Sequence, residues 1–220
     1  MNEYEVIKKI FYPLSFKKKF SLDLDDDAAF LPNKKQIVVG TDSIVEGDHF
    51  QKNEKNSSLI AKKLLRVNLS DIASMGAKPF GYTLNLSLPR KLNKKKLLKW
   101  IKLFAKGLRE DQLKYQIKLL GGDTVITNGS LILSVTLFGY KKKKIVKRSG
   151  ANLSDDIYVT GNIGDSGVGY KILLKKLNLN RNLNNYYINQ HKLPNPPIEF
   201  GKKLVEFANA ATDISDGLLA

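Results

Sequence analysis

The chain has 220 residues, is 42% hydrophobic, contains no cysteine, and has a formal net charge of +16 from 37 Lys and Arg against 21 Asp and Glu. The absence of cysteine excludes disulfides, cysteine-ligated zinc or iron–sulfur sites, and thiol catalysis. No apolar run reaches the roughly 20 residues of a membrane span, and the N-terminus lacks a signal-peptide pattern, so we expect a cytoplasmic protein with no membrane partner.

The first 140 residues alternate short strands with amphipathic helices. Apolar residues recur at helical spacing at Leu64, Leu65, Leu69 and Ile72, whereas "GYTLNLSLP" alternates in the period of two typical of a strand. On these patterns, strands are predicted at 36–43, 81–89, 117–125 and 130–140, and helices at 57–79 and 94–112.

A polar, turn-rich segment at 141–156 predicts a domain boundary near residue 148, which divides the chain into 1–148 and 149–220. In the second part we predict a strand at 156–161, a glycine-rich turn that opens a helix within 161–177, and a helix at 195–211. Because about 70 residues are few for a compact domain, we expect this second domain to be incomplete.

Aspartates stand beside Gly, Ser or Thr at the ends of several predicted elements. An Asp in that position is usually a turn residue or a helix cap, but Asp71 lies in the middle of a helix, where a cap explains nothing. Carboxylates are the ligands that Mg²⁺ prefers. The set therefore predicts a magnesium site, on which we expect at least the first four to converge: Asp27, Asp42, Asp71, Asp123, Asp213 and Asp216.

Other cation and phosphate sites fit the sequence less well. "DLDDDAAFLPNK" has the acidic spacing of an EF-hand, but Ala28 replaces the required Gly and Lys34 the bidentate Glu. The glycine-rich turn has the spacing of a Walker A loop, yet Tyr170 and Lys171 follow where Lys and Ser or Thr belong. That turn either contacts phosphate or simply permits a tight entry into a helix.

Seven motifs, taken in chain order, resemble those of the thiamine-monophosphate kinase family: "DDDAAFLP", "GTDSIVEGDHF", "VNLSDIASMGAKP", "LLGGDT", "RSGA", "YVTGNIGDSGVGY" and "DISDGL". The related aminoimidazole ribonucleotide and selenophosphate synthetases share the fold and aspartate-bound metals, but the absence of cysteine disfavours the latter. The resemblance covers nearly the whole chain.

The resemblance implies an α/β (α+β) fold of two domains, with mixed sheets flanked by helices, and a homodimer formed through the first domain. It implies transfer of the γ-phosphoryl group of ATP to thiamine monophosphate, with several Mg²⁺ ions. Metal ligands would be Asp27, Thr41, Asp42, Asp71, Asp123, Asp213, Ser215 and Asp216. ATP contacts would be Asp26, Asp27, Gly122, Asp123, Arg148 and Ser215, and His49 would contact the substrate.

No catalytic general base is expected. The second pKa of a phosphate monoester is about 6, so the attacking oxygen of the acceptor is largely ionised near neutral pH. This agrees with a chain that has only two histidines.

Three alternative functions stay open on the sequence. One is a related ATP-dependent synthetase, and another is a non-catalytic metal- or nucleotide-binding domain. A nucleic-acid binder is the third, but we expect no nucleic-acid partner, because only five of the 37 basic residues are arginine, whose bidentate fork suits base recognition better than lysine does.

Overall fold

The computed structural model describes residues 3–15, 36–52, 54–90, 93–141, 143–215 and 217–219. Its elements in chain order are the helix α1 (Glu3–Val6), the π-helical turn η1 (Ile7–Phe11), the 3₁₀ turn η2 (Tyr12–Ser15), β1 (Ile37–Val45), α2 (Ser57–Ser74), β2 (Lys78–Pro89), α3 (Lys94–Tyr115), β3 (Lys118–Thr127), β4 (Ile132–Tyr140), α4 (Asp165–Leu173), α5 (Arg181–Lys192), α6 (Ile198–Gly201) and α7 (Leu204–Phe207). No helix in these ranges combines the length and apolar character that a membrane crossing requires.

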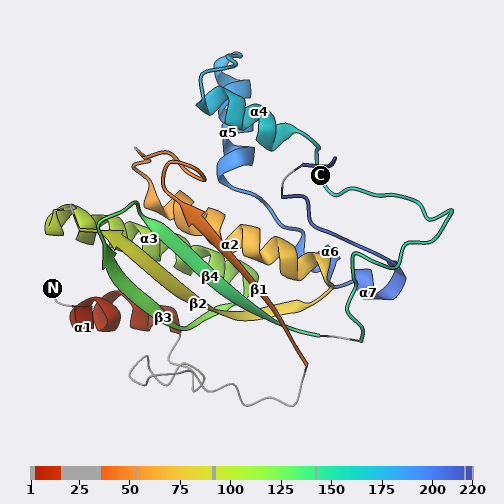
Figure 1. The fold of residues 1–220 in the computed structure, drawn as a ribbon, viewed down its shortest axis with the longest axis horizontal. Coiled ribbons are helices and arrows are strands. Elements are labelled where there is room, and N and C mark those ends of the chain that lie inside the picture. The colour runs from red at the N-terminus through yellow and green to blue at the C-terminus, as the bar shows by residue number, and fades with distance from the viewer. Residues whose placement is uncertain are drawn as a thin grey trace.

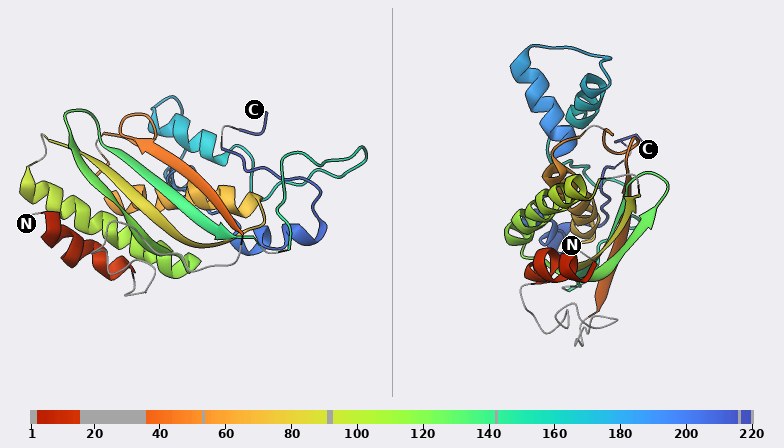
Figure 2. Two further views of the ribbon diagram at one scale, coloured as in Figure 1. Left: turned by 60° about the horizontal axis from the view of Figure 1, so that its bottom comes forward. Right: turned by 90° about the vertical axis from the view of Figure 1, so that its left-hand side faces the viewer.

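The centre of the molecule is a four-stranded mixed sheet in the order β1-β4-β2-β3. Strands β2 and β3 are parallel, while β4 is antiparallel to both β1 and β2. Parallel strands need a crossover connection, and α3 provides it between β2 and β3. Helices α2 and α3 cover one face of the sheet, and no described helix covers the other (Figures 1 and 2).

Local sequence signals start the two long helices. The Asn56 side chain accepts a hydrogen bond from the Ser58 amide at 3.2 Å, and the Asn93 side chain accepts one from the Lys95 amide at 2.9 Å. Each of these N-caps satisfies an amide that has no partner within its helix. The predicted helices and strands of residues 36–140 are present. Strand β2 and helix α3 extend a few residues further than predicted, whereas α2 ends at Ser74 and not at residue 79, because β2 begins at Lys78.

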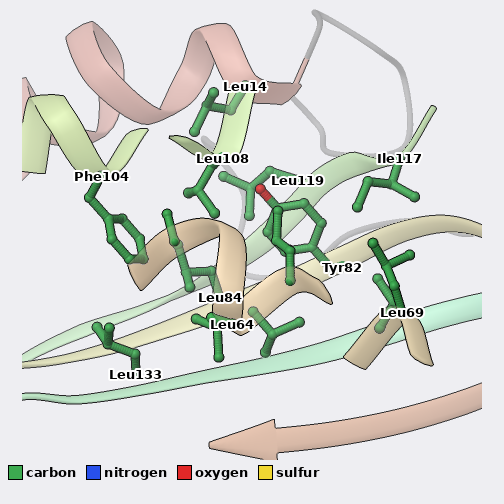
Figure 3. Packing of buried hydrophobic residues seen from close by; sticks show 14 of the residues in the cluster. Leu14, Leu64, Leu69, Tyr82, Leu84, Phe104, Leu108, Ile117, Leu119 and Leu133 are labelled. Carbon is green, nitrogen blue, oxygen red and sulfur yellow. The ribbon is translucent and has the colours of Figure 1, made fainter. Parts of the chain in front are cut away.

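The core lies between the sheet and the two helices. Leu64 and Leu69 of α2, Phe104 and Leu108 of α3 and Tyr82 of β2 are fully buried against one another (Figure 3). Each such side chain contributes about 1.5–3 kcal/mol by leaving water. This packing makes α2 a rigid support for the polar residues that it carries toward its ends.

The second part of the chain differs from the prediction in two places. Residues 156–161 form no strand, and Ile157 and Tyr158 are 92% and 85% exposed, because no described strand lies beside them to complete a ladder. The predicted helix at 195–211 is split into α6 and α7. Its backbone passes close to α2 at Gly201, where a β-carbon would lie 2.7 Å from the Ala73 carbonyl oxygen, and the chain turns immediately afterwards.

The glycine-rich turn opens α4, as predicted, with Gly164 at its N-cap. Helix α5, which was not predicted, packs against α4, and the two form a hairpin beyond one end of the sheet (Figure 1). The hairpin is tied to the first part of the chain by an ion pair between Lys192 and Glu54 and by a hydrogen bond from Gln51 Nε2 to the Leu173 carbonyl at 3.2 Å.

Candidate functional site

Three aspartates from separate elements meet at the edge of the sheet that β1 forms. Asp42 shares the helix-facing side of β1 with the buried Val38 and Ile44, because alternate residues of a strand point to the same face. Asp71, near the end of α2, lies over this strand, and its carboxyl group is within hydrogen-bonding reach of those of Asp42 and Asp213. The structure therefore brings Asp42, Asp71 and Asp213 together, although they are far apart in sequence.

Asp213 reaches this position because its segment is anchored to the chain that follows β4. Lys147 and Ala210 form a parallel bridge, and the Ala211 amide donates to the Lys147 carbonyl at 3.0 Å. The same alignment places Arg148 Nη2 3.9 Å from Asp213 Oδ1. Arg148 is 81% exposed and Asp213 only 10%, so the guanidinium covers the carboxylate from the solvent side.

Burial and nearby negative charge disfavour the ionised forms of Asp71 and Asp42. Burial, followed by the negative charges of Asp213 and Asp42, raises the pKa of Asp71 to about 7. Burial and then Asp213 also raise the pKa of Asp42, while a hydrogen bond with Asp71 and then the nearby His49 partly offset this. Like charges held together in this way indicate a site built for a cation.

The donor set fits a hard divalent cation, but the described residues do not form a complete metal cage. No group of three or more Asp, Glu or His side chains in the described ranges is arranged around a single ion position. Of the other expected metal ligands, Asp27 and Asp216 lie outside the described residues, as does Asp26, which is expected to contact ATP. Ser215 is exposed two residues after Asp213. Mg²⁺ usually takes only one or two protein carboxylates and completes its shell with water and substrate phosphates, so a partial cage is compatible with that ion.

Asp123 was expected to lie with the other carboxylates, and within one chain this prediction is wrong. Asp123 pairs with Asn85, which pairs with Ser134, which pairs with Ser43, and this polar row crosses the sheet on the face opposite Asp42. Strand β3, moreover, is at the far edge from β1. The sequence predicted that Asp123 ends an apolar strand, but the register that selects its face is set by long-range pairing.

The Thr41 side chain faces away from the aspartate cluster, and Gly122 lies in β3, at the far edge of the sheet from β1. The Thr41 hydroxyl donates to the Val135 carbonyl at 3.0 Å, so it is used within the sheet, on the face opposite Asp42. Gly122 lets β3 approach β2 closely, since a β-carbon there would lie 1.8 Å from the Leu84 carbonyl oxygen. Glycine is therefore required at position 122 by the packing of the two strands, in addition to the nucleotide contact that the family resemblance implies.

His49 lies in the tight loop that follows β1. Its Nδ1 accepts a hydrogen bond from the Val45 amide at 3.2 Å, and its own amide donates to the Val45 carbonyl at 2.9 Å. The side chain is exposed and lines a pocket between this loop, α2 and the α4–α5 hairpin. The pocket also contains Lys63 and His191, which the sequence reasoning did not assign; the spacing along the chain gave no sign that they would meet.

The fold and the site define a class of protein. The family model described as "AIR synthase related protein, N-terminal domain" matches residues 25–140, which is more than half of the chain. The thiamine-monophosphate kinase of Buchnera aphidicola subsp. Acyrthosiphon pisum is 39% identical over 224 residues, a match that covers 100% of this chain and 67% of that protein. The chain belongs to the thiamine-monophosphate kinase family.

Solved structures of thiamine-monophosphate kinases have the same fold as this chain. The crystal structure of thiamine-monophosphate kinase from Stenotrophomonas maltophilia K279a has a TM-score of 0.83 at 34% identity, covering 100% of this chain and 69% of that one. The structure of AaThiL complexed with AMPPCP and TMP has a TM-score of 0.77 at 27% identity, covering 99% and 69%. The chain thus spans about two thirds of the length of the relatives it matches. These comparisons confirm the predicted fold class and family.

Proposed function

We propose that this protein catalyses magnesium-dependent transfer of the γ-phosphoryl group of ATP to thiamine monophosphate, at the site formed by Asp42, Asp71 and Asp213. The observation that carries the proposal is the meeting of three carboxylates whose charges no described lysine or arginine fully balances. The family relationship and the AaThiL complex with AMPPCP and TMP support both substrates.

Each residue has a role that its position allows. The cluster of Asp42, Asp71 and Asp213 would supply one or two carboxylates to each Mg²⁺ ion, which would neutralise phosphate charge when bound. Arg148 presents a solvent-facing guanidinium beside Asp213, suited to a phosphate oxygen of ATP. His49 would contact and orient thiamine monophosphate at the mouth of the pocket. No side chain is needed to remove a proton, because the acceptor oxygen is already largely ionised at neutral pH.

Product analysis tests this proposal directly. The protein is mixed with ATP, MgCl₂ and thiamine monophosphate, and the expected products are thiamine diphosphate and ADP in equal amounts. Bound ATP with no product would favour the non-catalytic nucleotide-binding alternative. Retention on DNA that falls steeply between about 50 and 200 mM salt would instead favour a nucleic-acid binder.

We further propose that two copies pair through the sheet face that no described helix covers. Apolar side chains gather there: Val39 is 56% exposed, and Phe80 stacks on Tyr140 at 4.0 Å between ring centroids, with Phe138 beside it. An open sheet face with this composition is typical of a protein interface. Asp123 lies on the same face, so its proposed nucleotide contact would be near the pairing surface.

Val39→Asp is expected to weaken this dimer at least tenfold, because pairing would bury an unpaired carboxylate, which costs about 1.4 kcal/mol or more. Sedimentation equilibrium measures the dimer dissociation constant. Leu113→Asp is the matched control, since Leu113 is 60% exposed but lies on α3, on the helical side of the molecule. An unchanged dimer in Val39→Asp, or a monomeric unsubstituted protein, contradicts the proposed interface.

A further inference from the structure

The pocket beside His49 contains a lysine whose ammonium group has no carboxylate partner among the described residues. Lys63 projects from α2 between the β1–α2 loop and α5 and is half-buried. Its neighbour Lys62, in contrast, forms an ion pair with Glu110 of α3 at 2.5 Å. A cation taken from water needs other partners to offset the lost hydration, and those of Lys63 are neutral.

Lys63 Nζ joins two segments that are remote in sequence. It donates a hydrogen bond to the His49 carbonyl oxygen at 2.9 Å and lies 3.2 Å from His191 Nε2 on α5. The other ring nitrogen of His191 is 3.2 Å from Ser166 Oγ of α4, and the ring stacks on Tyr170 at 5.3 Å between centroids. The lysine therefore connects the His49 loop to both helices of the hairpin.

The charges of the two groups fix the direction of these hydrogen bonds. Burial and the nearby charge of Lys192 lower the pKa of Lys63 to about 8, so it is still mainly charged at pH 7. Burial, followed by the charge of Lys63, lowers the pKa of His191 to about 4, so the imidazole is neutral. The ammonium can then donate to Nε2, which leaves the imidazole proton on Nδ1, facing Ser166.

The position of Lys63 on α2 makes it a rigid tether. The next two residues, Leu64 and Leu65, are fully buried in the core. The loop, by comparison, is held mainly by its own turn, in which the Gly47 amide donates to the Phe50 carbonyl at 2.8 Å. The hydrogen bond from Lys63 to the His49 carbonyl therefore restrains His49 relative to the well-packed helix α2.

We propose that Lys63 is a positioning residue, which holds the His49 loop in place against helix α5 so that His49 is presented to the phosphorylated substrate. In one respect this inference rests on the proposed function, namely that His49 contacts thiamine monophosphate. The tether itself is independent of that assignment.

Lys63→Met tests the proposal, with Lys62→Met as the matched control on the same helix and Lys63→Arg as the conservative rescue. In Lys63→Met, the backbone amides of residues 46–50 are expected to exchange hydrogen at least about tenfold faster, because a hydrogen bond to a charged donor is lost. The dissociation constant and KM for thiamine monophosphate should rise about tenfold, with kcat within about threefold, as expected for lost substrate binding. Lys63→Arg should recover part of both effects.

The results separate the tether from the proposed function. Unchanged exchange in Lys63→Met, or equal changes in Lys62→Met, would overturn the tether, and a loosened loop with an unchanged dissociation constant would overturn the positioning role. If the unsubstituted protein binds no thiamine monophosphate in calorimetry, the proposed substrate is wrong. The exchange comparison then still decides whether Lys63 holds the loop.

Discussion

Asp71→Asn is expected to reduce magnesium-dependent turnover by about 10³-fold or more and, in the absence of Mg²⁺, to make the protein more stable. The loss follows from removing a carboxylate that contacts both Asp42 and Asp213, since a neutral amide is a poor ligand for a hard cation. The gain in stability follows because the ionised Asp71 is disfavoured in the metal-free fold. Turnover and thermal unfolding without metal measure these two effects, and Mg²⁺-dependent binding of a non-hydrolysable ATP analogue tests whether the lost turnover comes from lost metal binding.

The same substitution has a pH signature whose sign is fixed by the raised pKa. Asp71 has a folded pKa of about 7 against an ordinary value of 3.8, so the folded protein binds the proton more tightly than the unfolded chain. The stability that this proton contributes is fully present below about pH 4 and is lost as pH rises through 7. In Asp71→Asn this dependence should be absent. We therefore expect the stability difference between the variant and the unsubstituted metal-free protein to grow from pH 5 to pH 8.

Mg²⁺ should make the unsubstituted protein more stable than Asp71→Asn, the reverse of their order without metal. A bound cation compensates the carboxylates, so it should stabilise the unsubstituted protein more at pH 8 than at pH 6 and should hardly stabilise Asp71→Asn. Asp156→Asn is the control, because Asp156 is exposed in the segment after β4 and is not among the groups that shift the pKa of Asp42 or Asp71. Equal stabilisation of Asp71→Asn and the unsubstituted protein by Mg²⁺ would rule out Asp71 as a ligand.

Local patterns predicted the helices and strands of the first part of the chain, because the buried face of each one appears as a regular spacing of apolar residues within a short stretch of sequence. Helix α2 buries residues at the spacing seen in the sequence, and β2 alternates buried and exposed positions over most of its length. Helix α5 has no buried residue and is rich in asparagine, so its low helix propensity and few apolar residues hide it in the sequence. It forms where α4 and the first part of the chain support it.

The wrong predictions share a cause: each concerns a feature that is set by segments remote in the sequence. Ile157 and Tyr158 have strand-forming side chains, but a strand exists only when another pairs with it. Asp123 was placed correctly on a strand and incorrectly with respect to the site, because its face depends on the pairing of four strands. Asp42, Asp71 and Asp213 do meet, as the repeated placement of aspartates beside small residues suggested.

Among the substitutions proposed for this protein, loss of the Arg66–Asp111 ion pair is expected to lower the free energy of unfolding the most. Arg66 Nε and Nη2 donate to the two carboxylate oxygens of Asp111 at 2.7 and 2.8 Å, and Nη1 donates to the Pro194 carbonyl at 3.2 Å. The two residues are only 9% and 1% exposed. The pair therefore joins α2, α3 and the chain that follows α5 within a poorly hydrated region, where a lone charge is costly.

Arg66→Met should lower the free energy of unfolding by about 3–5 kcal/mol, because it leaves the Asp111 carboxylate buried without its partner. Arg66→Met combined with Asp111→Leu should recover most of this loss, since two apolar side chains need no mutual compensation. Lys106→Met, which removes an exposed pair with Glu110 at 3.9 Å, should cost no more than about 0.5 kcal/mol. Urea unfolding of the three variants measures these values, and a double variant no more stable than Arg66→Met would show that the unpaired carboxylate is not the cause.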